Sequence, residues 1–239
     1  MTLARTISLK FALLCFGSLI GCATRTNVSG GSLSYDKTHF VEVTTIIAKA
    51  QVELRYSTSH NFIGRPVKGY LADKCLLTRE AAFALLKVEK ELEKDHLSLH
   101  IYDCYRPQKA VNDFMSWSKD PNDQLTKKEF YPDVDKARVF ELGYVSSQSG
   151  HTRGSTIDLT IAPIDNPTAP LDMGTSYDFF SDLSATDNPL ITGIARTNRE
   201  RLKNLMQSNG FKNYEKEWWH YTLKDEPYPN TYFDFDIEL

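Results

Sequence analysis

Two short segments, far apart along the chain, carry the side-chain types that bind a catalytic metal ion. The first is Ser149-Gly-His-Thr-Arg-Gly-Ser-Thr-Ile-Asp158, and the second is Glu217-Trp-Trp-His220. Two imidazoles and a carboxylate (His151, His220 and Asp158) with water in the fourth position would form a catalytic zinc site. The same nitrogen and oxygen ligands also accept other divalent ions. Glu217 would then act as the general base, because a bound metal makes water more acidic.

Each segment also has a simpler interpretation. His151 and Asp158 could form an ordinary hydrogen bond where a strand begins, and Glu217 could be a surface residue beside an aromatic-rich core strand. Residues three apart in a regular strand point to opposite faces. Glu217 and His220 can therefore face one metal only if Glu217 lies in the loop before the strand or beside a bulge.

Arg106 lies between a predicted strand and a helix that starts at Pro107, a boundary where active sites are often built. Its fixed charge and five donors suit the oxyanion of a tetrahedral intermediate. A structural ion pair with Asp103 is the alternative. The remaining histidines occur in polar or strand contexts typical of surface or structural roles: His39, His60, His96 and His100.

Hydrophobic spacing predicts the helices that position these segments. One runs from a Thr78 cap to about Lys94, one starts at Pro107, and one covers about 196–208 with Gly210 as its stop. Their inward-facing residues are expected to be Ala81, Leu85, Val88 and Leu92, then Val111, Phe114 and Met115, then Leu202, Leu205 and Met206.

Alternating apolar residues predict the strands. Residues 97–101 form a half-buried strand that leads to Asp103. Residues 156–162 place Asp158 on the polar face, opposite Ile157, Leu159 and Ile161, and residues 211–223 supply a last strand. Helices and strands are interspersed without regular alternation, which favours an α+β fold over a doubly wound parallel sheet.

The N-terminus is typical of an exported lipoprotein. Basic residues flank an apolar run of roughly 10 residues, which makes residues 1–21 a signal peptide too short to span a bilayer. Leu19-Ile-Gly-Cys22 resembles a bacterial lipobox, in which Cys22 would carry the lipid anchor, although an incidental cysteine is the alternative. Residues 22–34 are expected to be a polar tether and 35–239 the catalytic domain, periplasmic or at the cell surface.

Composition narrows the possible partners. The chain has 239 residues and a net charge of -3, and removal of the signal leaves 26 basic and 31 acidic side chains. No basic patch is present, which argues against a nucleic-acid partner. Cys75 and Cys104 could form a disulfide or remain as two free thiols. Nothing in the sequence indicates the oligomeric state.

Taken together, several segments resemble the VanX-type D-alanyl-D-alanine dipeptidases, a branch of the zinc DD-peptidases. The likeness covers nearly all of residues 45–236, with five motifs in the right order. They are Asn61-Phe-Ile-Gly64 with Gly69-Tyr70, Tyr102-Asp-Cys-Tyr-Arg-Pro107, Ser149 to Thr160, Asp172-Met-Gly174 with Tyr177-Asp178, and Glu217-Trp-Trp-His-Tyr221.

The resemblance implies a small mixed, mostly antiparallel sheet flanked by helices, of the zinc DD-peptidase/hedgehog-like type, with one zinc per chain. It implies that the ligands are His151, Asp158 and His220, that Glu217 is the base, and that Arg106 stabilises the tetrahedral intermediate. It further implies that three residues bind a D,D-dipeptide substrate: Asp178 and Ser149 at its free amino group, and Tyr70.

Two departures from the family pattern stand out. Glycine occupies position 150, where serine is more usual, and the chain carries an export signal although VanX-type resistance enzymes act in the cytoplasm. We therefore expect turnover or scavenging of cell-wall dipeptides outside the cytoplasm. The alternatives are a zinc DD-carboxypeptidase or endopeptidase that trims peptidoglycan stems, and a non-catalytic lipoprotein that binds peptidoglycan.

Overall fold

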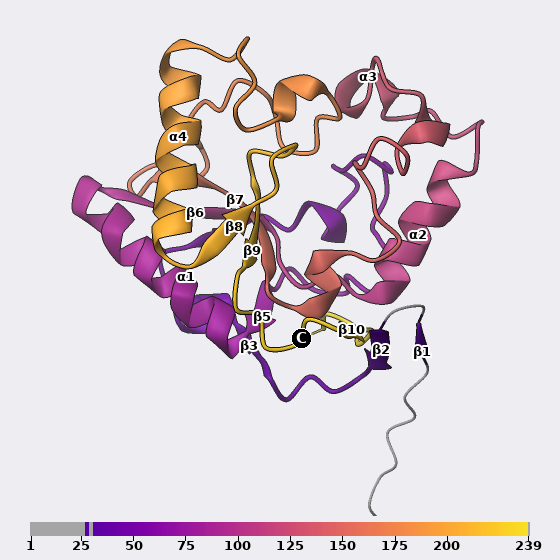
Figure 1. Cartoon of the computed structure of the whole chain (residues 1–239), viewed down its shortest axis with the longest axis horizontal. Helices are drawn as coiled ribbons and strands as arrows, with labels where there is room; N and C mark the ends of the chain where they lie inside the picture. Colours follow the sequence, from indigo (N-terminus) through magenta and orange to yellow (C-terminus); the bar gives the residue numbers. More distant parts are fainter. Residues whose placement is uncertain (1–26, 29–30, 239) are drawn as a thin grey trace, which may run out of the picture.

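A five-stranded sheet forms the centre of the protein (Figure 1). The structure is a computed structural model that describes residues 27–28 and 31–238. The strand order is β4-β6-β7-β9-β8, in which β4 pairs parallel with β6 and every other pair is antiparallel. The strands are β4 (Gln51–Val52), β6 (Leu97–Asp103), β7 (Thr156–Pro163), β9 (His220–Leu223) and β8 (Phe211–Asn213). This confirms the predicted α+β class with a small, mostly antiparallel sheet.

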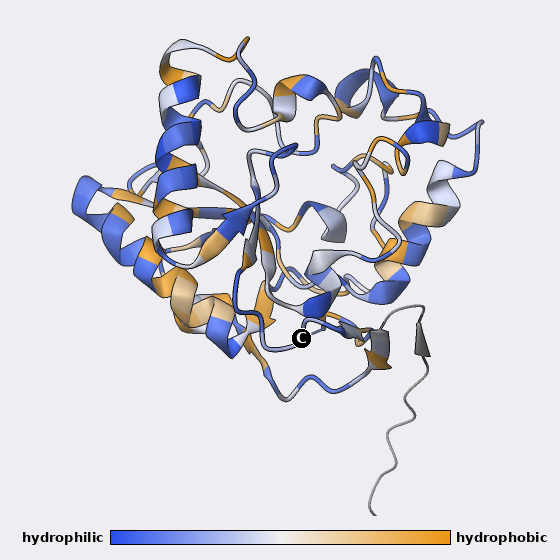
Figure 2. Ribbon diagram, in the orientation of Figure 1, coloured by the Kyte–Doolittle hydropathy of each residue, from blue (hydrophilic) through white to orange (hydrophobic). Residues whose placement is uncertain are grey.

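The helices lie around this sheet. They are α1 (Arg79–Leu92), α2 (Gln108–Ser118), α3 (Lys127–Phe130) and α4 (Gly193–Ser208). In Figure 1, α1 and α4 lie together on one side of the molecule, and α2 and α3 lie on the opposite side. The outer surface of α4 is mostly hydrophilic, and that of α1 is mixed, as Figure 2 shows. The buried apolar residues of both helices belong to the core.

Helix boundaries follow the sequence closely. The Thr78 hydroxyl accepts a hydrogen bond from the Ala81 amide and caps α1, and the predicted inner residues of α1 are all buried. Leu205 is half-buried but packs against the core, as predicted. The prediction for Met115 was wrong, because Met115 is half-buried away from the core cluster and Trp117 of α2 is buried instead.

The predicted strand over 211–223 is wrong, because the chain forms a hairpin there. Backbone hydrogen bonds from Glu217 N to Tyr214 O (3.0 Å) and from Tyr214 N to His220 O (3.0 Å) close a turn between β8 and β9. The strand β6 is also buried along its whole length rather than on one face. Its polar residues are satisfied inside: the Ser98 hydroxyl, for example, donates to Glu89 at 2.7 Å.

Two smaller sheets complete the fold. One pairs β3 (Phe40–Glu42) with β5 (Leu76–Thr78), and the other contains β1 (Asn27–Val28), β2 (Gly31–Ser34) and β10 (Thr231–Phe233). Because β2 pairs with β10, the folded part of the chain begins before residue 35. The predicted tether 22–34 is therefore wrong at its C-terminal end, where residues 31–34 form β2. The predicted signal peptide 1–21 and Cys22 lie outside the described residues. Within 27–28 and 31–238, no helix is long and apolar enough to cross a membrane.

A disulfide joins Cys75 to Cys104, which decides between the two alternatives that the sequence left open. Cys75 directly precedes β5 and Cys104 directly follows β6, so the bond ties the small sheet to the central one. Both residues are buried. The crosslink therefore fixes the start of the segment that carries Arg106.

Replacing both cysteines (Cys75→Ala with Cys104→Ala) is expected to lower the free energy of unfolding by about 3 kcal/mol. The bond spans 29 residues, and a crosslink over such a loop reduces the conformational entropy of the unfolded chain. Urea denaturation of the variant and the oxidised wild type measures the difference. A change smaller than about 0.5 kcal/mol, the usual scale for surface substitutions, would contradict the expectation.

Candidate active site

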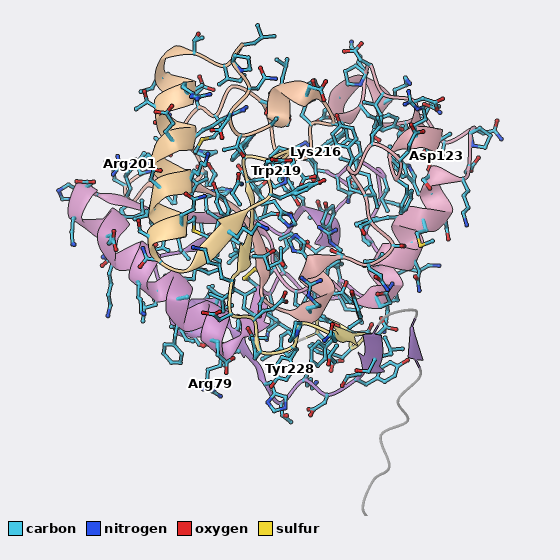
Figure 3. All side chains as sticks on the ribbon, in the orientation of Figure 1. Arg79, Asp123, Arg201, Lys216, Trp219 and Tyr228 are labelled. Atoms are coloured by element: carbon cyan, nitrogen blue, oxygen red, sulfur yellow. A yellow bond between two sulfur atoms is a disulfide. The ribbon has the colours of Figure 1, made fainter. Side chains whose placement is uncertain are left out.

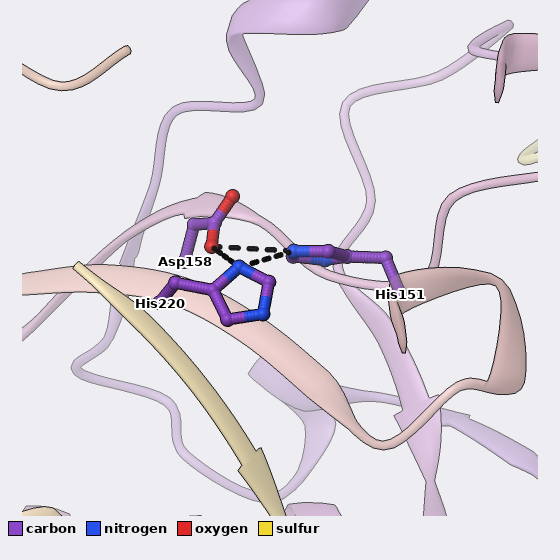
Figure 4. A group of neighbouring side chains, drawn as sticks. All are labelled: His151, Asp158 and His220. Atoms are coloured by element: carbon purple, nitrogen blue, oxygen red, sulfur yellow. Dashed lines mark hydrogen bonds and ion pairs between the residues drawn. The ribbon is translucent and has the colours of Figure 1, made fainter. Parts of the chain in front are cut away.

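The sheet brings the predicted metal ligands together. Asp158 lies on β7 and His220 on β9, and the two are directly paired across the antiparallel ladder. His151 lies in a short 3-10 turn, Gly150–Arg153, just before β7. Figure 4 shows the three side chains pointing at one another. Their ligand atoms all lie within 4.8 Å of one another.

The polar atoms of this cluster are arranged as metal ligands are. His151 Nδ1 lies 2.7 Å from the Cys104 carbonyl oxygen, a contact in which Nδ1 donates and Nε2 keeps its lone pair. Nε2 lies 3.2 Å from Asp158 Oδ1, and His220 Nδ1 lies 3.1 Å from the same oxygen. Apart from these two imidazole nitrogens, this buried oxygen has no polar partner among the described residues. Because buried polar atoms need a partner, the three residues fit a divalent cation.

The charge state of Asp158 agrees with this arrangement. Burial alone would raise the pKa of its carboxyl, but the neighbouring imidazoles of His151 and His220 outweigh burial and hold the pKa well below its usual value. The second oxygen of Asp158 accepts a hydrogen bond from the Tyr177 hydroxyl at 3.1 Å. The carboxylate is therefore ionised and oriented toward the two imidazoles.

Glu217 lies in the turn before β9, which meets the geometric condition that the sequence set. Its Oε2 lies 3.4 Å from His220 Nδ1, so both groups face the same point. Burial, followed by the charges of Asp158 and Asp178, raises the pKa of Glu217 well above its usual value. A buried carboxyl of this kind can take a proton and give it back, as a general acid–base catalyst does.

Arg106 pairs with Asp103, which was the alternative from sequence, and it also lines the cavity, so the ion pair leaves its predicted role at an oxyanion open. Its Nε and Nη2 lie 3.0 and 2.9 Å from Asp103 Oδ2, and the guanidinium carbon lies 5.1 Å from the centre of the Tyr56 ring. Tyr70, expected to contact substrate, does not line the cavity. Its hydroxyl instead donates to Asp103 at 2.6 Å, so Tyr70 orients Arg106 through Asp103.

Asp178 provides a third buried carboxyl in the cavity, besides Asp158 and Glu217. The Tyr56 hydroxyl donates to it at 2.8 Å. Burial, together with the nearby charge of Asp158, raises the pKa of Asp178 to about 8. Tyr56 was missed from the sequence, because it lies in a polar stretch that reads as a loop and its ring becomes buried only through tertiary packing.

A cavity of about 270 Å³ joins these groups. Pockets for drug-sized ligands measure about 300–1,000 Å³, so this one suits a small ligand. Ser149 lies at its wall and caps the turn that carries His151, since its hydroxyl accepts from the His151 amide at 3.3 Å. The wall is formed by Tyr56, Phe62, Arg106, Phe114, Gly143, Tyr144, Val145, Ser146, Ser149, Gly150, Asp158, Asp178, Tyr214, Glu217 and His220.

The sequence matches the family model described as D-Ala-D-Ala dipeptidase, peptidase family M15, over residues 36–238. The chain belongs to this family. It is 40% identical over 199 residues to a D-alanyl-D-alanine dipeptidase of Enterococcus faecium, covering 83% of this chain and 98% of that protein. It is 39% identical over 198 residues to one of Streptomyces coelicolor, again covering 83% and 98%.

Among solved structures, a vancomycin-resistance D,D-pentapeptidase, VanY, in complex with Zn(II) matches with a TM-score of 0.37 and 14% identity. The match covers 65% of this chain and 76% of that chain, and a likeness this low supports no argument about the fold. Membership of the dipeptidase family confirms the family and the enzyme class predicted from sequence: the chain is a metallopeptidase.

Replacing Asp158 with asparagine is expected to weaken the binding of a divalent metal ion by at least about 100-fold, because it removes the one carboxylate of the ligand set. Competition with a chromogenic chelator measures the affinity. The matched control is Asp165→Asn, an exposed carboxyl just beyond the same strand, which should bind as the wild type does. Equal affinities for the two variants would contradict the assignment.

Proposed function

We propose that the enzyme hydrolyses free D-alanyl-D-alanine to D-alanine, with one zinc ion per chain held by His151, Asp158 and His220. The observation that carries the proposal is that this ligand set converges at the edge of one small cavity, which is lined by Asp158, His220, Glu217 and Asp178. Two imidazoles and a carboxylate are a donor set that zinc favours at catalytic sites. The relatives named as D-alanyl-D-alanine dipeptidases support the choice of substrate.

Zinc, when bound, supplies positive charge that polarises a carbonyl group and makes water more acidic. The side chains around it perform the proton transfers and stabilise charge. Glu217, with its raised pKa, accepts a proton from the attacking water and returns it to the leaving amine. Arg106 is fixed by Asp103 and presents its guanidinium to the oxygen on which negative charge develops.

Asp178 is the partner proposed for the free amino group of the dipeptide. A buried carboxyl gains most from an ammonium ion placed beside it, because burial has already removed its water. Tyr56 holds the carboxyl in place at 2.8 Å, and Ser149 lines the same cavity. A longer peptide has an uncharged amide where the ammonium would be, so this contact favours a free dipeptide.

Glu217→Gln is expected to lower kcat by about 100- to 10,000-fold, the usual contribution of a general base. Zinc content should stay that of the wild type, because Glu217 is not among the proposed ligands. Steady-state kinetics with metal analysis of the same samples tests this. Undiminished turnover in a metal-loaded sample of the variant would refute the role of Glu217 and favour another base. A non-catalytic peptidoglycan-binding protein would show no turnover in the wild type or in the variant.

Free D-alanyl-D-alanine should be cleaved with a higher kcat/KM than its N-acetyl derivative, by at least about 100-fold, because a site built to pair a charged group strongly rejects an analogue that lacks it. Release of D-alanine from both substrates gives the ratio. A preference for the acetylated form would instead identify a DD-carboxypeptidase or endopeptidase that trims stem peptides.

The KM for free D-alanyl-D-alanine should fall as the pH rises toward about 8. Since the pKa of Asp178 is raised to about 8, its carboxyl holds a proton below that pH, and only the ionised form attracts an ammonium group. Asp178→Asn should have a higher KM that lacks this trend. A pH profile of KM that is the same in both enzymes would contradict the pairing.

For the setting of this reaction, we propose turnover or scavenging of wall-derived dipeptides by an exported protein anchored through Cys22. The signal-like residues 1–21 and the buried Cys75–Cys104 disulfide support export, since disulfides persist in oxidising compartments. Fractionation of cells that produce the native protein, with mass analysis of its N-terminus, tests the proposal. A cytosolic protein with an uncleaved N-terminus would overturn it.

A further inference from the structure

Helix α4 carries a buried positive charge that the proposed chemistry does not use. Arg199 is only 1% exposed, and it takes part in none of the ion pairs found among the described residues. Burial lowers the pKa of Arg199 to about 10. A buried cation without an ion-pair partner is stable only if its donors are hydrogen-bonded, so the hydrogen bonds of Arg199 decide what it holds in place.

The guanidinium of Arg199 donates to four oxygens on one loop. Its Nε donates to the Met173 carbonyl at 2.6 Å and its Nη2 to the Thr175 hydroxyl at 3.3 Å. Its Nη1 donates to the carbonyls of Leu183 and Ala185 at 3.0 and 2.8 Å. Two of these acceptors precede Asp178 and two follow it. One side chain therefore fastens together the two ends of the loop that presents the proposed ammonium-binding carboxyl.

The backbone at Asp178 has a conformation that is uncommon for a residue with a side chain. Its φ of 58° lies in the left-handed region, which residues with a side chain adopt far less often than glycine. Strained residues persist only where the surrounding structure determines them. The adjoining Tyr177 hydroxyl contacts Asp158 at 3.1 Å, so a shift of this loop would also disturb the proposed metal ligand.

We propose that Arg199 is a positioning residue that sets the Asp178 carboxyl for the substrate ammonium group. The inference rests on the proposed function, and it adds a residue outside the cavity to the determinants of dipeptide recognition. Lysine keeps the charge but has no planar fork of donors, so it cannot reach both ends of the loop at once. Arg199→Lys should therefore move Asp178 without removing the cation.

A double-mutant cycle between Arg199→Lys and Asp178→Asn tests this coupling. Arg199→Lys alone should lower kcat/KM for free D-alanyl-D-alanine by about 100-fold, mostly through KM, the scale expected when a binding group is displaced by about 1 Å. In the Asp178→Asn background the same replacement should change kcat/KM by less than about twofold, because the group through which it acts is already lost.

Arg201→Lys is the matched control. Arg201 lies two residues further along α4, on its outer surface (Figure 3), and pairs there with Asp95. Its replacement should leave kcat and KM as in the wild type. Circular dichroism and thermal unfolding establish that each variant is folded. If Arg199→Lys does not fold, Thr175→Val takes its place in the cycle. It removes one acceptor of Arg199 and also the acceptor of the Trp218 indole, so it should raise KM in the wild-type background and leave KM unchanged in the Asp178→Asn background.

The outcomes separate the inference from the function on which it rests. If Asp178→Asn leaves KM unchanged, the ammonium site itself is wrong. If Asp178→Asn raises KM but Arg199→Lys has the same effect in both backgrounds, the positioning role of Arg199 is overturned while the ammonium site stands. A loss in Arg199→Lys that falls on kcat alone would likewise contradict the inference.

Discussion

The whole site depends on the pairing of β7 with β9, which sets Asp158 opposite His220. Four buried carboxyls lie around this pair: Asp158, Asp178 and Glu217 in the wall of the cavity, and Asp103 behind Arg106. Arg106 is the one permanently charged cation among the residues that line the cavity. Burial raises the pKa of three of these carboxyls, which is the behaviour of a cluster that lacks positive charge. A divalent ion at the ligand set, with an ammonium ion beside Asp178, would supply that charge.

The fold divides the site between strands and loops. The proposed metal ligands lie on or next to strands of the central sheet, and the Cys104 carbonyl, next to the disulfide, orients His151. The groups proposed to act on substrate instead come from loops, namely the turn with Glu217 and the loop with Asp178. Those loops are held by buried side chains behind the cavity: the Trp218 indole donates to Thr175 at 2.9 Å, and Trp219 lies in the interior (Figure 3).

The sequence predicted features that depend on local pattern and missed those that depend on long-range packing. The cap at Thr78, the stripe of α1 and the polar face of β7 follow from residue spacing alone. The sequence did not predict that the last strand is divided into β8 and β9, because the aromatic residues Trp218 and Trp219 suit a strand and a buried turn equally well. The condition placed on Glu217 nevertheless required a loop at this point, and the structure has one.

The residues around Arg106 show the same limit of prediction from sequence, which is that local pattern does not reveal long-range packing. Sequence motifs indicated that Tyr70 belongs to the site, but only the fold distinguishes a residue in the cavity wall from one that supports it. Tyr70 supports Asp103, while Tyr56 reaches the cavity from a stretch without periodicity. The Cys75–Cys104 bond likewise required the strands to be placed before the pairing could be assigned.

Zinc K-edge X-ray absorption spectroscopy on the purified protein tests the central claim most directly, because it reports the atoms around the ion. We predict one zinc per chain with nitrogen and oxygen neighbours only, the scattering pattern of two imidazoles, and loss of one imidazole in His220→Ala. Sulfur neighbours, or a spectrum unchanged by His220→Ala, would contradict the claim that His151, Asp158 and His220 form the metal site.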